Sequence, residues 1–213
     1  MINVDHQINA VTRQVGNLVL ESGEARTVTI SQTYDSDIDD VWDACTNIER
    51  IPRWFLPITG DLRLGGHYQL EGNAGGAIEN CDPPHFFSAT WEYGGGVSWI
   101  EVRLTAESAS RTRFELQHIA HVDDDQWAQF GPGAVGVGWD LAFIGLSLHL
   151  QSGATVDPDE VAAWTVSDDG KRFMTESSEA WGDANIANGA DASEADAQAR
   201  RTTTAYTGGG DPA

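Results

Sequence analysis

The sequence predicts an α+β fold in which a curved antiparallel sheet wraps around one long C-terminal helix. Two observations support this prediction. Several strand patterns follow one another between residues 61 and 120, separated by Gly, Pro or Ser turns of the kind that join antiparallel neighbours. Residues 131–150, GPGAVGVGWDLAFIGLSLHL, then form a helical pattern that is apolar around most of its girth. A sheet curved around this helix would bury it.

The same apolar stretch fits two other descriptions, and both are disfavoured. Gly131, Gly133 and Gly136 satisfy the G-x-G-x-x-G fingerprint, but that fingerprint must follow a strand and open the helix of a βαβ unit, whereas here it follows the polar stretch HVDDDQWAQF. A membrane span would place Asp140 near mid-bilayer and would have no basic flanks. We therefore expect a buried helix that starts near Pro132, with its early glycines allowing close backbone packing.

The helix pattern sets its apolar residues three or four apart, at Val135, Trp139, Ala142, Phe143, Leu146 and Leu150. Its narrow polar edge consists of Asp140, Ser147 and Gln151.

The N-terminal part of the chain contains one ambiguous segment and one clear strand. Residues 1–23 fit a helix striped by Ile8, Val11, Val15 and Leu18, or a strand over 17–20, and both alternatives stay open. From Arg26 onward, apolar and hydroxyl side chains alternate with the two-residue period of a half-buried strand. The apolar set is Val28, Ile30 and Tyr34, and the polar set is Thr27, Thr29, Ser31 and Thr33.

The segment DSDIDDVWDACTNIERIPRWF predicts a helix capped by Ser36 or Asp37, which Pro52 breaks into two short pieces. Its apolar face carries Ile38, Val41, Trp42 and Cys45. The strands of the meander follow as DLRLGGHYQLEG, GAIENCD, HFFSATWEY, SWIEVRLTA and RTRFELQHIA.

Residues 152–207 are rich in Ala, Asp, Ser and Gly and predict a helical extension. Asp157 and Asp191 are candidate N-caps. One helix should place Phe173, Ala180, Trp181, Ala184 and Ala187 on roughly one side. We expect this extension to fold back on the domain or on a second subunit. The predicted organisation is an N-terminal segment (1–24), the main domain (25–151), the extension (152–207) and a loose tail (208–213).

The chain is strongly acidic, with 33 Asp and Glu against 12 Lys and Arg and a formal net charge of -21. This balance argues against nucleic-acid binding and against docking on anionic membranes. Cys45 and Cys81 have no metal or redox spacing, and we expect both to be buried structural residues. The first residues show no signal-peptide pattern, so a cytoplasmic protein is expected.

Five segments together resemble a known family, the START-like (SRPBCC) superfamily, and within it the proteins similar to the activator of heat-shock-protein-90 ATPase, often labelled polyketide-cyclase-like. They are DVWDACTNIERIPRWF, DLRLGGHYQL, CDPPHFFSATWEY, TRFELQHIAH and GVGWDLAFIGL. The resemblance covers about residues 25 to 150 and implies a helix-grip (START/Bet v-like) fold with a cavity between sheet and helix. Members of the superfamily include carriers of apolar molecules, aromatase/cyclases, resistance proteins and chaperone activators, so the fold does not fix the function.

Strand parity predicts which side chains face the interior. Ile100 and Leu104 share the inward phase, and Ile78 and Cys81 differ in parity, which requires a bulge. The inward set suits a flat apolar ligand, although the same side chains would also fill a solid core. The candidate ligand-binding residues are Trp54, Phe55, Tyr68, Leu70, Phe87, Ala89, Trp91, Val102, Phe114, Leu116, His118, Trp139 and Phe143.

Strand parity places no pair of carboxylates on the inward face of the sheet. The pair of Asp or Glu side chains that usually acts as general acid and base in a hydrolase is therefore not predicted there. Tyr68 and His118 are the inward polar groups. We expect His118 to be a neutral core histidine bonded to a backbone carbonyl, with a ligand contact or catalysis as alternatives. His118 and His121 should point to opposite faces, so they do not predict a metal site with Asp123, Asp124 and Asp125, which we expect to form a solvated loop. No catalytic residue and no cofactor is predicted.

Three functions fit this pattern. The first is a START-like protein that binds an apolar or aromatic small molecule between sheet and long helix. The second is a cyclase or hydrolase-type enzyme that uses His118 and Tyr68 as proton donors and acceptors. The third is a protein-interaction module, with the helical extension as the contact surface for a chaperone or for a second copy in a homodimer.

Overall fold

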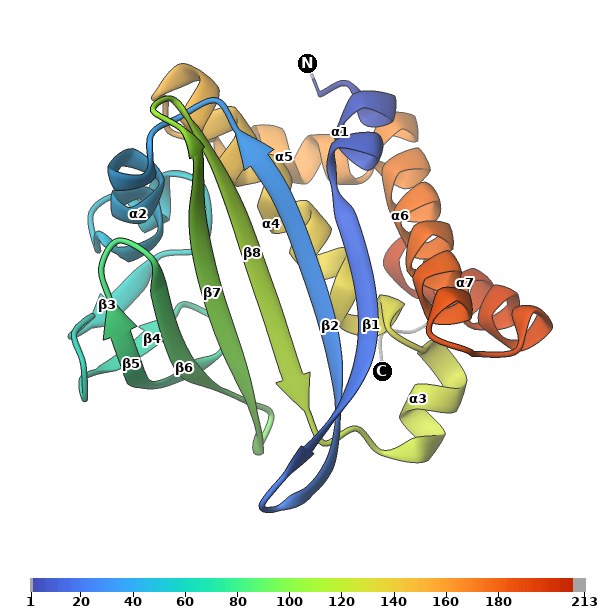
Figure 1. The fold of residues 1–213 in the computed structure, drawn as a ribbon. Helices are drawn as coiled ribbons and strands as arrows, with labels where there is room; N and C mark the ends of the chain where they lie inside the picture. Colours follow the sequence, from blue (N-terminus) through green and yellow to red (C-terminus); the bar gives the residue numbers. More distant parts are fainter. Residues whose placement is uncertain (1, 209–213) are drawn as a thin grey trace. The chain divides into compact units, whose positions relative to one another are not determined.

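The eight strands of the described chain lie between residues 12 and 120 and form one sheet in the order β1-β2-β8-β7-β6-β5-β4-β3 (Figure 1). The computed structural model describes residues 2–208. Its strands are β1 (Thr12–Leu20), β2 (Gly23–Tyr34), β3 (Ile58–Gly60), β4 (His67–Leu70), β5 (Gly75–Asp82), β6 (Phe86–Tyr93), β7 (Gly96–Ser108) and β8 (Arg111–Ala120). Its helices are α1 (Val4–Ala10), α2 (Ile38–Thr46), the 3-10 helix η1 (Ile51–Arg53), α3 (Asp124–Phe130), α4 (Gly133–Ser152), α5 (Pro158–Thr165), α6 (Asp168–Ala187) and α7 (Ala192–Tyr206).

The chain divides into two units, and β2 and α4 each run through both of them. Unit 1 combines residues up to 30, 121–141 and the described part of the chain from 157 onward. Unit 2 combines residues 31–120 and 142–156. The helical extension therefore belongs to the same unit as the N-terminal segment and the first half of α4.

The antiparallel meander is confirmed, because β4 to β8 pair in sequence order. A register shift between Ile78 and Asn80 supplies the bulge that the parity of Ile78 and Cys81 required. The sequence analysis missed β3, which pairs with β4. Its three residues, directly after Pro57, are too few to show an alternating pattern.

The ambiguous N-terminal segment contains both a helix and a strand. Asn3 caps α1 by accepting a hydrogen bond from the His6 N–H, and β1 follows after Val11. The prediction of a half-buried β2 was wrong, since Thr27, Thr29 and Ser31 are buried as well as the apolar set. The strand lies between β1 and β8, and small hydroxyl side chains such as that of Thr27, which lies against Gly16 of β1, fit a tightly packed second face.

Helix α2 begins at Ile38, and Asp37 caps it by accepting a hydrogen bond from the Asp40 N–H. The predicted break lies earlier than Pro52, because α2 ends at Thr46 and Pro52 occupies the first turn of η1. The fixed φ of proline suits that position.

The long helix α4 begins directly after Pro132, as predicted. Length and composition alone would allow it to cross a membrane, yet 61% of its most apolar window is buried inside the protein. That is the pattern of the core helix of a soluble protein. Two details differ from the expectation: Val135 is 37% exposed, and the polar residues Asp140 and Ser147 are buried. Asp140 and Ser147 can be buried because each accepts a hydrogen bond from a buried side chain, Asp140 from Ser177 and Ser147 from Gln32.

Two of the three helices of the extension, α5 and α7, start at the predicted caps, and α6 starts after Ser167, which was not predicted. Asp157 accepts from the Asp159 N–H, and Asp191 accepts from the Glu194 N–H. The predicted apolar side of α6 was partly wrong, since Ala187 is exposed and Ala180 and Ala184 are only half-buried. The buried face instead combines Phe173 and Trp181 with small or polar residues, namely Gly170, Met174, Ser177, Ser178, Gly182 and Asn185. The buried face of α6 is hard to recognise from hydrophobicity, because several of its residues are polar and form hydrogen bonds to buried partners. The loose tail predicted from residue 208 falls mostly outside the described residues.

Two further expectations are corrected. Cys81 is exposed, because the inward parity of β5 ends at its bulge and the last four residues of the strand lie in solvent; Cys45 is half-buried. The acidic run at 123–125 is solvated but does not form a loop, since the Asp123 side chain accepts from the N–H groups of Asp125 and Gln126 and caps α3.

The glycines at the start of α4 allow close packing within unit 1, as predicted. A Cβ atom at Gly136 would overlap the indole ring of Trp181, and one at Gly133 would press on the side chain of Thr202. Gly138 lies on the exposed side of the helix, where a Cβ would meet only the Tyr206 hydroxyl at 3.4 Å.

This difference predicts opposite effects of the same substitution two residues apart. Gly136→Ala should lower the free energy of unfolding by about 1–3 kcal/mol, because the buried Trp181 ring has no space to move into. Gly138→Ala should raise it by up to about 1 kcal/mol through helix propensity. Urea unfolding of both variants measures the two values, and effects of equal sign would contradict the close packing at Gly136.

Candidate functional site

The inward face of the sheet in unit 2 is built from aligned rows of side chains. Strand pairing places Phe87 of β6 opposite Val102 of β7, and Val102 opposite Leu116 of β8. The next row contains Ala89, Ile100 and His118 in the same way. The predicted inward residues of three strands are therefore neighbours on one face.

The second half of α4 contacts this face. The Phe143 ring lies 5.2 Å from the ring of Phe114 in an edge-on arrangement, and both side chains are buried. Gly145 lets the backbone oxygen of Trp54 approach the helix closely. An antiparallel sheet with a long helix packed on it is what the sequence predicted for this part of the chain.

The predicted ligand-binding residues fall into two groups by burial. Val102, Leu116 and His118 are buried, as are Tyr68, Leu70, Ala89, Phe114, Trp139 and Phe143. Four aromatic side chains are only half-buried, and these are Trp54, Phe55, Phe87 and Trp91. Trp139 belongs to unit 1, whereas the other twelve residues belong to unit 2.

The half-buried aromatic rings are held in place by neighbours. Phe87 lies edge-on to Trp42 of α2 with ring centres 6.0 Å apart. Trp54 stacks on Phe55 at 5.4 Å, and its indole N–H donates to the backbone oxygen of Ala44 at 2.8 Å. Rings fixed in this way present apolar surface at little cost in conformational freedom.

His118 forms a short polar chain within the apolar face. Its Nε2 lies 2.8 Å from the Ser98 hydroxyl, which in turn donates to the backbone oxygen of Trp91 at 3.0 Å. Because Ser98 donates its proton to Trp91, His118 Nε2 must carry the proton that Ser98 accepts. Burial lowers the pKa of His118 to about 4, so the imidazole is neutral. The burial of this imidazole agrees with the predicted neutral core histidine, and the partner of its Nε2 is the Ser98 hydroxyl.

Tyr68 is committed to a structural hydrogen bond. Its hydroxyl donates to the backbone oxygen of Thr90 at 2.7 Å, and burial raises the pKa of the phenol. Tyr68 lies on β4 and His118 on β8, with β5, β6 and β7 between them in the sheet. Four strand spacings amount to about 19 Å along the sheet. The two polar groups therefore do not form an acid–base pair on neighbouring strands.

The carboxylates of the strands lie on the opposite face, as the parity indicated. Glu71 and Glu92 are exposed. Glu101 and Glu115 are half-buried and not fully in solvent, because each pairs with an arginine two residues away on its own strand, at 2.6 Å and 2.9 Å. These pairs lie outside the apolar face.

A charged cluster holds α2 to the end of α4 in unit 2. The Arg50 guanidinium pairs with Asp40 at 2.7 Å and Asp43 at 3.1 Å, and its Nε donates to His149 Nε2 at 3.0 Å. His149 Nδ1 donates to the backbone oxygen of Ala154 at 2.8 Å. Partial burial raises the pKa of Asp40, but hydrogen bonds from Ser36 and Arg50 outweigh it and lower the pKa below its ordinary value. The contacts of Arg50 and His149 lie within unit 2 and link α2 to α4, which is a structural role.

A second buried charged cluster lies in unit 1. The fully buried Asp140 accepts two hydrogen bonds from Arg13, at 2.7 Å and 2.9 Å, one from the Ser177 hydroxyl at 2.6 Å and one from the Trp181 indole at 2.9 Å. Arg13 is 5% exposed and also donates to the backbone oxygens of Ile8 and Val11. This cluster joins β1, α4 and α6 through hydrogen bonds within unit 1.

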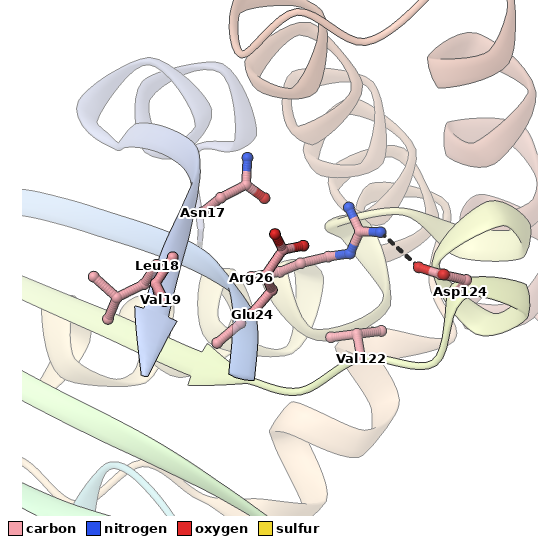
Figure 2. Close-up of a pocket in the computed structure, with 8 residues that line it drawn as sticks. Asn17, Leu18, Val19, Glu24, Arg26, Val122 and Asp124 are labelled. Carbon is pink, nitrogen blue, oxygen red and sulfur yellow. Dashed lines mark hydrogen bonds and ion pairs between the residues drawn. The ribbon is translucent and has the colours of Figure 1, made fainter. Parts of the chain in front are cut away.

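Unit 1 also contains an open pocket of about 360 Å³ beside the β1–β2 hairpin (Figure 2). It is lined by residues 17–19 of β1, residues 24–26 of β2, Val122 and Asp124. The Arg26 guanidinium lies 4.4 Å from the centre of the Trp127 ring and pairs with Asp124 at 2.9 Å. The lining of the pocket combines polar and apolar side chains.

Within residues 2–208, no group of three His, Cys, Asp or Glu side chains comes together to hold a metal ion. His121 is exposed and bonds to the Ser22 hydroxyl and to the backbone oxygen of Glu24, each at 2.8 Å. Burial raises the pKa of the Cys45 thiol to about 12, which keeps it unreactive at neutral pH.

Sequence reasoning missed Ser98 and the hairpin pocket. Ser98 shares the inward parity of Ile100 and Val102, so strand parity could have placed it beside His118. Nothing in the local pattern predicts that Arg26 would lie on Trp127, because the two residues are a hundred positions apart.

Comparison with known proteins identifies relatives of this chain. The family model described as Activator of Hsp90 ATPase homolog 1-like protein matches residues 35–151, slightly more than half of the chain. CalU16 from Micromonospora echinospora, in its crystal structure, is 35% identical to this chain, with a TM-score of 0.64. The alignment covers 82% of this chain and 98% of the CalU16 chain. The solution NMR structure of CalU16 is 34% identical, with a TM-score of 0.70. The alignment covers 84% of this chain and 97% of the CalU16 chain. None of the curated proteins matches.

A more distant likeness concerns the fold alone. A conserved protein of unknown function from Enterococcus faecalis is 11% identical, with a TM-score of 0.59, and covers 85% of this chain and 95% of that chain. The family match and CalU16 confirm the predicted α+β helix-grip fold. The CalU16 likeness covers far more of the chain than residues 35–151, so it also includes segments outside the region that the family model matches.

Proposed function

Because the chain belongs to the Activator of Hsp90 ATPase homolog 1-like family, we propose that it binds an apolar or aromatic small molecule on the inner face of its sheet, beside the long helix. The observation that carries this proposal is on β6. Phe87 and Trp91 flank the small Ala89 on the inward face and remain half-buried, while Ala89 itself is 1% exposed. Rings that are fixed but not fully covered supply apolar surface for a flat ligand.

The polar groups of this face suit a ligand with few polar atoms. His118 and Ser98 satisfy each other, and burial keeps the imidazole neutral. A ligand oxygen could exchange for one of these partners, whereas a charged ligand would be desolvated without a counter-ion. The apolar contacts then supply most of the affinity, at about 25 cal/mol per Å² of buried surface.

The two other functions lack a supporting observation of their own. An enzyme that uses His118 and Tyr68 needs both groups at one substrate, but the Tyr68 hydroxyl donates to Thr90 and three strands separate the two residues. A module that uses the helical extension to contact a chaperone or a second copy needs an apolar patch there. The aromatic residues Phe173 and Trp181 of α6 are fully buried. The large apolar side chains that the extension exposes are Val161 and Val166. The binding of a small molecule is therefore the favoured function.

A larger side chain at Ala89 tests the proposal. The neutral aromatic probe N-phenyl-1-naphthylamine should bind the wild-type chain with a saturable rise in fluorescence. Ala89→Leu adds three carbons to the inward face and should weaken probe binding by about tenfold or more. The matched control is Thr105→Leu on β7, an exposed position on the opposite parity, which should leave the affinity unchanged.

Two results would overturn the proposal. One is the absence of saturable binding by the wild-type chain. The other is an equal effect of Ala89→Leu and Thr105→Leu, which would place the probe on the outer surface. Circular dichroism confirms that each variant retains the fold before its titration is interpreted.

A further inference from the structure

The half of β1 that follows Gly16 is an exposed sheet edge. In the described chain β1 is the terminal strand of the sheet, with β2 as its neighbour. Its first half is anchored, because Arg13 is buried against Asp140, and α6 packs against the strand. Its second half carries Leu18, which is 40% exposed, and Val19, which is 79% exposed.

Exposed edges of this kind are usually protected. Natural sheets place lysine, proline or a bulge on an edge strand to prevent pairing with another chain. The sequence of this half strand, Asn17 to Leu20, contains no lysine and no proline, and Val19 is a β-branched residue with high strand propensity. Because this half of β1 is an unprotected edge, an extended segment of another chain can pair with it as an additional strand.

The pocket beside this edge determines the kind of partner (Figure 2). Its acidic residues are Glu24 and Asp124, both exposed, and Glu21 and Asp125 lie close along the chain. The one basic residue that lines it, Arg26, is paired with Asp124 and stacked on Trp127. The whole chain carries a net charge of -21. A partner with positive charge is therefore attracted, and a negatively charged one is repelled.

We propose that the Asn17–Leu20 edge of β1 binds an extended basic peptide segment of another protein, which adds to the sheet as a strand. Alternate side chains of an added strand point to opposite faces. Every second residue of the added peptide would place an apolar side chain against Leu18 or Val19. The residues between them would point to the other face and place a lysine or arginine in the pocket near Glu24. A second copy of this chain is a poorer occupant, because pairing two β1 edges would bring together two acidic chains and two sets of Glu24 and Asp124.

The test uses the full chain and a fluorescein-labelled peptide of alternating lysine and valine. Fluorescence anisotropy at about 0.15 M salt limits the contribution of the overall charge. Val19→Lys adds a protective edge lysine and should weaken peptide binding by about tenfold. The matched control is Val166→Lys, which makes the same change of charge at a valine that is 70% exposed between α5 and α6. It should change the affinity by less than about twofold.

Further variants separate backbone pairing from simple attraction. A peptide with N-methyl groups on alternate residues keeps its charge but cannot donate to the edge, and it should not bind. Glu24→Gln should weaken binding of the unmodified peptide and leaves the apolar edge intact, so it gives an answer even if Val19→Lys fails to fold.

Four outcomes would overturn the proposal: no binding of the peptide, equal weakening by Val19→Lys and Val166→Lys, equal binding of the N-methylated peptide, or a wild-type dimer in sedimentation velocity that Val19→Lys abolishes. The last outcome would assign the edge to a second copy. None of these results depends on the apolar face of unit 2, so this proposal can fail while the small-molecule proposal stands.

Discussion

Replacing Asp140 with alanine is expected to lower the free energy of unfolding by about 3–5 kcal/mol. The substitution leaves the Arg13 guanidinium, which is 5% exposed, without its counter-charge. It also removes the acceptor of the Ser177 hydroxyl and the Trp181 indole, both fully buried. A buried charge that loses its partner cannot be rehydrated without opening the structure, which is why the cost is large.

The matched control is Asp124→Ala, which removes a different Asp–Arg pair from the same unit. Arg26 and Asp124 lie 2.9 Å apart, but the Asp124 side chain is 94% exposed. An exposed pair contributes at most about 1 kcal/mol, so this variant should remain close to the wild type. Urea unfolding followed by tryptophan fluorescence measures both values. If the two variants lose equal stability, the buried cluster does not hold β1, α4 and α6 together.

The second large effect is a loss of stability on acidification that depends on His118. Burial lowers the pKa of this imidazole from 6.5 to about 4. Between these values the unfolded chain binds a proton that the folded chain does not bind, so acid favours unfolding. The stability is fully present above pH 6.5 and is lost as the pH falls toward about 4, and the loss amounts to roughly 3 kcal/mol.

His118→Gln tests this effect because glutamine can donate to Ser98 but does not titrate. The variant should lose less stability than the wild type between pH 7 and pH 4, as measured by urea unfolding at several pH values. Ser98→Ala serves as the control, since it removes the hydroxyl but keeps the buried ring and should retain the wild-type slope. If His118→Gln and the wild type have the same slope, the imidazole is not buried and neutral as described.

Periodicity predicted the parts of the fold that depend on one buried face. Strand parity placed Phe87, Ala89 and Leu116 on the inward face, and the bulge near Ile78 followed from two residues of opposite parity. The candidate residues on the strands of unit 2 were predicted in the same way. Each of these inferences uses only the two-residue repeat of a strand, which a sequence displays directly.

The features that were missed depend on contacts between distant segments. Arg13 and Asp140 are far apart in the sequence, and the residues around each of them give no indication that the two form an ion pair. The buried face of α6 includes Ser177 and Asn185, whose polar atoms are satisfied by other segments. Hydrophobicity identified Phe173 and Trp181 on this face but not these polar residues. Burial of both faces of β2 likewise depends on what packs around the strand and not on its own alternating pattern.

Intermolecular nuclear Overhauser effects between N-phenyl-1-naphthylamine and the methyl groups of the protein test the central claim most directly. If unit 2 binds a flat apolar molecule on its inner face, the probe protons should give effects to the methyl groups of Ala89, Val102 and Leu116. Those methyl groups are buried, so a probe on the outer surface cannot approach them. Effects confined to exposed methyl groups such as that of Thr105, or none at all, would contradict the proposed binding site.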